Sequence, residues 1–285
     1  MNSIGIIINN EKKEAVAITE QIAGWLQKHD KKVMVTHIGS EAVNHDLITC
    51  SEEELAREAE CIIVLGGDGT LLSCARTIAA NGIPMFGVNL GQLGFLTEIE
   101  LPDLEPALEK LISGQFQIEE RMMIQATVRR GGMEISSFHA LNDAVITKGA
   151  FARLIRLKTF VNDEYFDIFP ADGLIISTPT GSTAYSLSSG GPLVVPDLRL
   201  MLVTPICPHT LYSRPLVIDQ DSIVKVEVEN TQAEVMLTID GQSGFQLQPH
   251  DEVVIKKAPF YAKFMKLNQR GFYEILRRKL KEGGQ

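Results

Sequence analysis

The sequence predicts an α/β N-terminal domain with a parallel sheet, followed by a mostly antiparallel, all-β C-terminal domain. The first part is predicted because short apolar runs alternate with amphipathic segments up to about residue 120, which implies parallel strands joined by right-handed crossovers. The second part is predicted because apolar and polar residues alternate singly from about Met122 onward. We expect an α/β domain at 1–120, a ligand-binding β domain at 121–258, and a C-terminal segment at 259–285 that returns to the first domain.

The strands of the first domain are expected to be short, buried and joined by helices in a Rossmann-like arrangement, with ligands at the carboxyl ends of the strands. Ile62–Leu65 is β-branched at three of its four positions, which suits a strand covered on both faces. Ser51-Glu52-Glu53-Glu54 is typical of a capping box at a helix start. The predicted elements are strands at Ile4–Ile8, Lys32–His37, Ile62–Leu65 and Ile83–Val88, and helices within 15–26, 51–60, 71–79 and 104–112.

The second domain is expected to consist of alternating strands joined by tight turns. Gly131-Gly132 and Asn162-Asp163 are both plausible hairpin turns. After this domain, Phe272–Leu280 returns to helical spacing, and we expect that helix to pack back on the first domain. The predicted strands are Ile124–Arg129, Leu154–Val161, Ser222–Val228 and Glu234–Ile239.

Composition excludes several classes of function. The net charge of −9 argues against a nucleic-acid partner, because phosphate-backbone binding needs a concentrated basic surface. No apolar run reaches the length of a membrane span and the first residues have no basic segment, so we expect a cytoplasmic protein without a membrane partner. The four cysteines contain no C-x-x-C pair, and we interpret them as reduced thiols that hold neither a metal nor a disulfide. They are Cys50, Cys61, Cys74 and Cys207.

A glycine-rich turn, Gly66-Gly67-Asp68-Gly69, follows the apolar strand at Ile62–Leu65. Its glycines permit positive φ and a close approach of the backbone to a ligand, and free backbone N–H groups at the helix start beyond it, up to Thr70, form an anion site. A carboxylate beside a bound phosphate needs either a divalent cation between them or a reacting hydroxyl whose proton it takes. Asp68 therefore points to phosphoryl transfer. The alternative is that Asp68 only caps the helix and the glycines form a tight turn.

A second glycine-rich loop, Gly87–Phe95, follows the next predicted strand. Because parallel strands end at the same edge of a sheet, this loop is expected beside the first, and the two would outline a cleft. Phe95 could stack on a base at its rim, or it could belong to the core.

Three polar sequences interrupt the β domain. The run Ser177–Tyr185 is rich in small hydroxyl residues around a glycine, which suits sugar hydroxyls and phosphate oxygens, although a turn that satisfies its own backbone is the alternative. Asn142-Asp143 could bind an amide-and-diol ligand such as nicotinamide riboside, or form a β-bulge with local bonds. Asp240-Gly241-Gln242 is most simply a hairpin turn.

Taken in order, these residues resemble the NAD kinases of the ATP-NAD kinase family, over almost the whole chain. The resemblance rests on Gly66–Thr70, Asn89–Thr97, Asn142-Asp143, Asp172–Pro192, Pro208–Leu211 and Arg214-Pro215. It implies transfer of a terminal phosphoryl group to the 2′-hydroxyl of the adenosine ribose of NAD. Two departures stand out: Asp143 occupies a position where the family usually has Glu, and Ala171 one where it often has Gly or Ser.

The resemblance also implies a role for each matching residue. Asp68 would be the general base, with Gly69 against the ligand. Asn142 and Asp143 would bind the ribose and nicotinamide side of NAD. The adenosine half would be held by Asp172, Thr183, Ala184, Tyr185, Ser186 and Ser188. Phe95, Arg153 and Gln242 would be further ligand contacts, and Gly66, Gly67, Gly69 and Thr70 would bind phosphate.

The implied ligands are NAD and ATP, the latter with a divalent metal ion, Mg²⁺ or Mn²⁺, and no metal site made by protein side chains is expected. A homo-oligomer, dimer or tetramer, is also implied. Two other functions remain open: a lipid or sugar kinase of the related Gly-Gly-Asp-Gly group, and an NAD(P)-sensing module that binds without turnover. Asp68 separates the last of these from a kinase, because a sensor needs no carboxylate beside a phosphate site.

Overall fold

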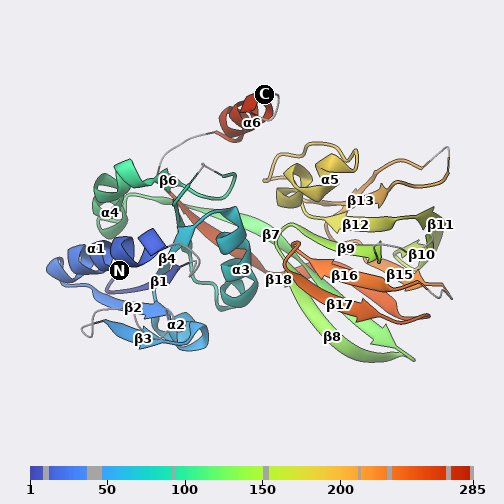
Figure 1. The fold of residues 1–285 in the computed structure, drawn as a ribbon, viewed down its shortest axis with the longest axis horizontal. Helices are drawn as coiled ribbons and strands as arrows, with labels where there is room; N and C mark the ends of the chain where they lie inside the picture. The colour runs from blue at the N-terminus through green and yellow to red at the C-terminus, as the bar shows by residue number, and fades with distance from the viewer. Residues whose placement is uncertain are drawn as a thin grey trace. The chain divides into compact units, whose positions relative to one another are not determined.

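The computed structural model describes residues 1–8, 13–36, 47–91, 94–149, 154–210, 213–229, 233–267 and 271–282. The chain divides into two compact units, one of Met1–Glu120 with Ala262–Gln285 and the other of Arg121–Tyr261 (Figure 1). Each of the two boundaries falls inside a strand, β7 (Gln117–Arg130) or β18 (Glu252–Lys266).

The first unit contains the predicted parallel sheet. Its strand order is β3-β2-β1-β4-β5, with all neighbours parallel, and β6 adds to β5. From β1 the chain continues to β2 and β3 on one side, and then to β4 and β5 on the other side of β1. The strand order therefore reverses between β1 and β4, and open α/β sheets bind their ligands at such a point. The strands are β1 (Ser3–Ile8), β2 (Lys32–Thr36), β3 (Ile48–Cys50), β4 (Cys61–Gly66), β5 (Met85–Asn89) and β6 (Ile99–Glu100).

Helices cover both faces of this sheet because its strands are apolar on both. On one face, residues of α1 and α4 form a core with Ile4, Ile6 and Ile63. On the other, Gly5 lies against Leu55 of α2 and Gly87 against Leu71 of α3, so the helices approach the strands closely where a Cβ is missing. The helices that cover the sheet are α1 (Lys13–Lys28), α2 (Glu52–Glu58), α3 (Asp68–Ile78) and α4 (Leu104–Ile112), and the unit also contains α6 (Phe272–Glu282).

The second unit contains two sheets. One has the order β14-β13-β12-β9-β16-β17 and is antiparallel throughout. In the other, β11, β10, β15 and β18 are antiparallel neighbours, and β7 pairs with β18 and β8. The further bounds are β8 (Met133–Ala140), β9 (Asp143–Lys148), β10 (Ile155–Val161), β11 (Glu164–Ala171), β12 (Gly173–Ser177), β13 (Leu200–Ile206), β14 (Leu216–Asp219), β15 (Val224–Val228), β16 (Val235–Ile239) and β17 (Ser243–Leu247).

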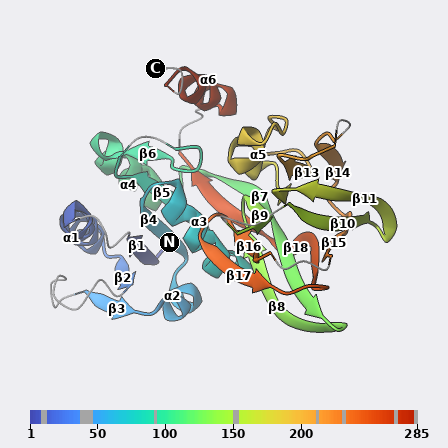
Figure 2. The same cartoon turned by 45° about the vertical axis from the view of Figure 1, so that its right-hand side comes forward.

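Both predicted hairpin turns are confirmed. Gly131 and Gly132 join β7 to β8 with φ values of 56° and 82°, and Asn162 and Asp163 join β10 to β11 with φ values of 52° and 62° (Figure 2). Two consecutive residues with positive φ are what a type I′ turn requires, and Gly, Asn and Asp tolerate that backbone best.

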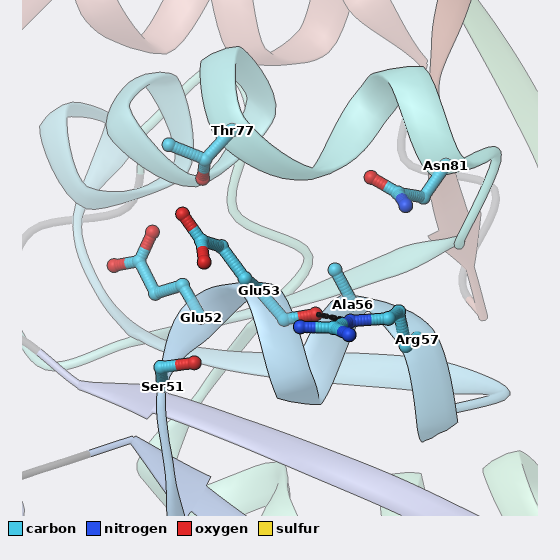
Figure 3. A pocket seen from close by; sticks show the side chains of 7 residues that line it. All are labelled: Ser51, Glu52, Glu53, Ala56, Arg57, Thr77 and Asn81. Atoms are coloured by element: carbon cyan, nitrogen blue, oxygen red, sulfur yellow. Dashed lines mark hydrogen bonds between the residues drawn. The ribbon is translucent and has the colours of Figure 1, made fainter.

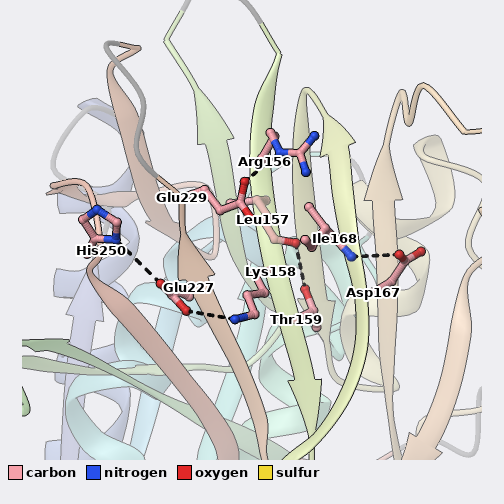
Figure 4. A network of polar contacts seen from close by, with 9 residues as sticks. All are labelled: Arg156, Leu157, Lys158, Thr159, Asp167, Ile168, Glu227, Glu229 and His250. Atoms are coloured by element: carbon pink, nitrogen blue, oxygen red, sulfur yellow. Dashed lines mark hydrogen bonds and ion pairs between the residues drawn. The ribbon is translucent and has the colours of Figure 1, made fainter.

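Buried and exposed side chains alternate along β10, which explains why this strand could be predicted from the sequence. Leu157 and Thr159 are buried in the unit, while Arg156 and Lys158 lie on the outer face among acidic side chains (Figure 4). Arg156 Nε lies 2.6 Å from Glu229 Oε2 and Lys158 Nζ lies 4.0 Å from a carboxylate oxygen of Glu227. Such solvent-exposed ion pairs contribute little to stability, so we assign this face no further role.

The capping box at α2 is confirmed as well. Ser51 Oγ accepts a hydrogen bond from the Glu54 amide at 3.2 Å, and the Glu54 carboxylate accepts one from the Ser51 amide at 2.8 Å. Beside this helix lies a hollow of about 590 Å³, into which the side chains of α2 point toward α3 (Figure 3). None of the predicted site residues lines it. Its lining residues are Ser51, Glu52, Glu53, Ala56, Arg57, Thr77 and Asn81.

The cysteines are free thiols in the described part of the chain, and only Cys207 among them is exposed. Burial raises the pKa of the Cys61 thiol to about 12, so it stays protonated at neutral pH. None of the helices within the described ranges is both long and apolar enough to cross a membrane.

Candidate active site

The glycine-rich turn lies where the sequence places it, directly after β4 at the carboxyl edge of the parallel sheet. Asp68 is the first residue of α3, and Gly67 is the N-cap with φ of −112°. Neither Gly66 nor Gly67 uses the positive φ that glycine permits. Gly66 is required for space instead, because a Cβ there would lie 2.2 Å from Thr70 Oγ1.

The carboxylate of Asp68 binds the second glycine-rich loop. Asp68 Oδ2 accepts a hydrogen bond from the Phe95 amide at 2.7 Å, and Oδ1 accepts from the Leu96 and Thr97 amides at 3.0 and 3.3 Å. We call this arrangement of one carboxylate and three consecutive amides the Asp68 clamp. Gly94 makes it possible, because a Cβ at that position would lie 2.0 Å from Asp68 Oδ1.

The Asp68 clamp argues against the alternative that this residue only caps the helix. A helix cap would accept hydrogen bonds from the first turn of α3, whereas the donors to Asp68 lie 27 to 29 residues further along the chain. Three amide donors hold both oxygens of the carboxylate in place, and Asp68 is only half-buried.

Phe95 takes part in this clamp through its backbone. Its half-buried ring lies with its centroid 6.4 Å from that of Phe272, at the start of α6, and the two rings are tilted by 40°. Stacking of Phe95 on a base stays a prediction.

A second carboxylate, that of Asp240, holds the Asn142-Asp143 sequence in the same manner. Asp240 Oδ1 accepts from the Asn142 and Asp143 amides at 2.8 and 3.1 Å, and Oδ2 accepts from the Leu141 amide at 3.1 Å. In return, the Asp240 amide donates to the Asp143 carbonyl at 3.0 Å. We call this the Asp240 clamp. The backbone amides of the polar pair are thus bound by the β16–β17 turn, 97 to 99 residues away, and not by a local acceptor.

A cavity of about 310 Å³ opens beside the Asp240 clamp. Burial and, second, the charge of Asp240 raise the pKa of Asp143 to about 7. Burial also raises the pKa of Tyr185, with smaller contributions from Cys207, Asp172 and Asp143. The cavity is lined by Asn142, Asp143, Val145, Thr147, Ala184, Tyr185, Thr238, Asp240 and Gly241.

The hydroxyl-rich run supports the other side of the Asn142-Asp143 turn. Thr178 Oγ1 donates to the Leu141 carbonyl at 2.5 Å, and the Thr178 amide donates to the Asn142 carbonyl at 2.9 Å. Gly181 packs directly on this backbone, since a Cβ there would lie 2.2 Å from the Asn142 carbonyl oxygen. The turn is therefore fixed from two sides.

Several hydroxyls of the run have partners inside the protein. Ser182 exchanges hydrogen bonds with the backbone of Val194, and Ser186 Oγ lies 3.0 Å from Thr204 Oγ1. Thr183 Oγ1 donates to the Thr180 carbonyl at 3.2 Å. Only the Thr183 bond is local, whereas Ser182 and Ser186 bond to segments 12 and 18 residues away. Ligand contacts by Thr183, Ser186 and Ser188 stay predictions.

Comparison with known proteins identifies the chain. Residues 4–116 match the model of the ATP-NAD kinase N-terminal domain, and residues 141–267 match that of the ATP-NAD kinase C-terminal domain. The chain belongs to the ATP-NAD kinase family. It is accordingly a kinase, and the lipid or sugar kinase alternative is set aside.

Full-length relatives agree with this assignment. The NAD kinase of Desulforamulus reducens is 48% identical over 287 residues, which cover 99% of this chain and 98% of that protein. The NAD kinase of Moorella thermoacetica is 48% identical over 288 residues, covering 100% and 91%. Two solved structures share the fold at 24% identity. A yeast NADH kinase complexed with NADH has a TM-score of 0.89 and coverage of 99% and 88%, and an Archaeoglobus fulgidus NAD kinase in complex with ATP has 0.76, with 97% and 98%.

The remaining predicted residues of this family member are placed as follows. Asp172 forms an ion pair with Lys148, whose Nζ lies 3.1 Å from its Oδ1. The Gln242 amide donates to the Ile239 carbonyl at 2.9 Å, in the hairpin turn that follows β16. Arg153 lies outside the described residues.

Asp240 was considered from the sequence only as part of a turn. An Asp-Gly pair after a strand is the usual signature of a hairpin, and nothing local indicates that its carboxylate faces another strand end. Within the described ranges, no group of three His, Cys, Asp or Glu residues could hold a metal ion.

Proposed function

We propose that this member of the ATP-NAD kinase family transfers the terminal phosphoryl group of ATP to the 2′-hydroxyl of the adenosine ribose of NAD. The products are NADP and ADP. The proposal is supported by the family assignment together with one observation, the Asp68 clamp at the switch point of the parallel sheet.

Asp68 acts as the base in this proposal. The 2′-hydroxyl oxygen forms a bond to the terminal phosphorus while the bond from that phosphorus to the bridging oxygen of ATP breaks, and the hydroxyl proton passes to the Asp68 carboxylate. In phosphoryl transfer the protein contributes mainly by positioning the reacting groups and by stabilising charge. The clamp supplies positioning, because three amides fix both carboxylate oxygens.

A divalent ion, Mg²⁺ or Mn²⁺, fits this site as a partner of ATP. The described residues offer no cluster of protein ligands, and Mg²⁺ usually keeps several waters while binding one or two carboxylates and substrate phosphates. When bound, the ion neutralises charge on the phosphate oxygens. In this proposal the backbone at the start of α3, at Gly67, Gly69 and Thr70, contacts the same phosphates.

The NAD molecule is recognised in this proposal by the second unit. Asn142 and Asp143 bind its ribose and nicotinamide side, while Asp172 and the Thr183–Ser188 segment hold the adenosine half. The cavity of about 310 Å³ beside Asp143 supports this assignment, because it is lined by both an amide and carboxylates. We extend the proposal to a cytoplasmic homo-oligomer.

The test is an assay of the purified chain with NAD, ATP and Mg²⁺, in which NADP is followed by an NADP-specific dehydrogenase. We expect the wild type to form NADP and Asp68→Asn to bind NAD while losing about 10²- to 10⁴-fold in kcat, the usual range for a positioned general base.

The control is Asp163→Asn, which changes an exposed aspartate in a hairpin turn. Binding of NAD by the wild type without NADP formation would favour the sensing module. A loss below tenfold in Asp68→Asn would remove Asp68 from the role of base.

A further inference from the structure

The turn between β16 and β17 contains a carboxylate that the turn itself does not need. Asp240 and Gly241 have φ values of 50° and 66°, a type I′ backbone that Asn or Gly adopts equally well. Asp163 is a natural comparison, because it has φ of 62° in the β10–β11 turn of the same unit. Asp163 is exposed, whereas Asp240 is only 7% exposed.

Burial of the Asp240 carboxylate costs free energy, which indicates that the carboxylate has a role at this position. A desolvated carboxylate is unfavourable unless hydrogen bonds satisfy it, and a second carboxylate, Asp143, lies close enough to feel its charge. Three amide hydrogen bonds compensate for this cost. All three come from Leu141–Asp143, the residues that bring Asn142 and Asp143 to the cavity.

We propose that Asp240 is a positioning residue of the NAD site, whose carboxylate fixes the backbone of Leu141–Asp143 so that the side chains of Asn142 and Asp143 face the cavity. The inference rests on the proposed function for the identity of the ligand. Asp240 acts here through its neighbours. It supplies no proton and no nucleophile.

The contacts around the turn show why one residue can have this effect. Thr178 and Gly181 hold the carbonyl side of Leu141 and Asn142, but the amide side has Asp240 as its acceptor. Loss of the carboxylate leaves three consecutive amides without their acceptor, and the turn then has to rotate or take up water. A rotation moves both ligand-binding side chains together.

The test compares Asp240→Gly and Asp240→Asn with Asp163→Gly and Asp163→Asn. Each pair changes a positive-φ aspartate in a hairpin turn, so the backbone preference is matched. We expect Asp240→Gly to raise the KM for NAD by about tenfold or more, equivalent to about 1.4 kcal/mol of binding free energy. We expect kcat and the KM for ATP to change by less than about threefold, and the Asp163 variants to match the wild type.

The pH profile provides a second readout. The titratable groups that face Asp143 are Asp240 from the β16–β17 turn and Tyr185 from α5 (Tyr185–Ser188). Tyr185 is in turn near Asp172 and Cys207. Because the charge of Asp240 raises the pKa of Asp143, Asp240→Asn should move the Asp143 transition in the KM for NAD to lower pH. The transition would stay in place only if the Asp240 carboxylate did not lie beside Asp143.

Asp240→Asn keeps the shape of the side chain, so it serves if Asp240→Gly does not fold, and thermal unfolding of each variant shows which case applies. An unchanged KM for NAD in the folded Asp240 variants would overturn the proposal. So would a loss confined to kcat, or a pH transition that stays where it is in the wild type.

Discussion

The Asp68 clamp and the Asp240 clamp use the same chemistry in two different surroundings. In each, one carboxylate accepts hydrogen bonds from three consecutive backbone amides of a distant segment. Asp68 is half-buried at a helix start, whereas Asp240 is buried in a hairpin turn. The amides fix both carboxylates, and Asp68 is the more exposed of the two.

The difference between the clamps indicates a division of labour. In the Asp68 clamp the accepting carboxylate is itself the proposed reacting group. In the Asp240 clamp the carboxylate serves the segment that donates to it, and the neighbouring Asp143 faces the cavity. Changes in the first clamp should therefore reduce kcat, and changes in the second should raise the KM for NAD.

Gly94→Ala should have the largest effect among the variants that leave both clamp carboxylates in place. Its Cβ would lie 2.0 Å from Asp68 Oδ1, so the carboxylate has to leave the Phe95–Thr97 amides. We expect kcat to fall by about 10²-fold, the cost of misplacing a catalytic group by about 1 Å. Steady-state kinetics measure it, with Gly24→Ala as control because a Cβ at Gly24 meets nothing within 4 Å. Unchanged kcat in Gly94→Ala would show that the clamp is dispensable.

Asp143→Asn tests the electrostatics of the second clamp. The pKa of Asp143 is raised from 3.8 to about 7, so the folded protein holds a proton between these pH values that the unfolded chain has lost. The stability due to Asp143 is thus complete below about pH 4 and is lost as the pH rises through 7.

We therefore expect the free energy of unfolding of the wild type, minus that of Asp143→Asn, to fall by about 3 kcal/mol from pH 4 to 7, on the scale of about 1.4 kcal/mol per unit of pKa shift. Urea unfolding at several pH values measures it, with Asp163→Asn as control. A difference independent of pH would contradict the raised pKa.

Gly181→Ala disturbs the Asn142-Asp143 turn from the side opposite Asp240. The new Cβ would lie 2.2 Å from the Asn142 carbonyl oxygen, so the turn has to shift. We expect the KM for NAD to rise by about tenfold, about 1.4 kcal/mol, with a smaller change in kcat. Gly244→Ala is the matched control, because a Cβ there meets only Met236 Cε at 3.4 Å. If Gly181→Ala lowered only kcat, the two clamps would not have the separate effects on kcat and on the KM for NAD that we propose.

Ser51→Ala should have the smallest effect, since it removes a neutral cap outside both clamps. The capping box of α2 loses one of its two reciprocal bonds, and we expect about 1 kcal/mol of lost stability. Thermal unfolding measures this loss, and kinetic constants should stay at their wild-type values. If Ser51→Ala changed the affinity for NAD, a substitution outside both clamps would be shown to affect binding.

Local signals explain what the sequence predicts well. The apolar run before Gly66 and the helical spacing after Thr70 fix the position of Asp68, and Asn162-Asp163 marks its hairpin by turn chemistry alone. Strands such as β14 and β17 went unpredicted. They lie at the two edges of their sheet. There, pairing with the neighbouring strand decides whether a segment is a strand, and the pattern of apolar and polar residues does not.

Contacts between distant segments explain what was missed. The donors to Asp68 could be anticipated only as a neighbouring loop, because the strand order β4-β5 brings that loop to the same edge. The partners of Asp240 lie 97 to 99 residues away, and its Asp-Gly sequence is identical to that of an ordinary turn. Likewise, the hydroxyls of Ser182 and Ser186 resemble ligand donors until their internal partners are known.

The most direct test measures kcat and the KM for NAD of Asp68→Asn and Asp240→Asn in one assay with saturating ATP and Mg²⁺. Our account predicts that Asp68→Asn loses at least about 10²-fold in kcat with its KM for NAD within about threefold. It predicts that Asp240→Asn shows a raised KM for NAD with nearly unchanged kcat. The same pattern in both variants, whichever constant changes, would contradict the division of labour between the two clamps.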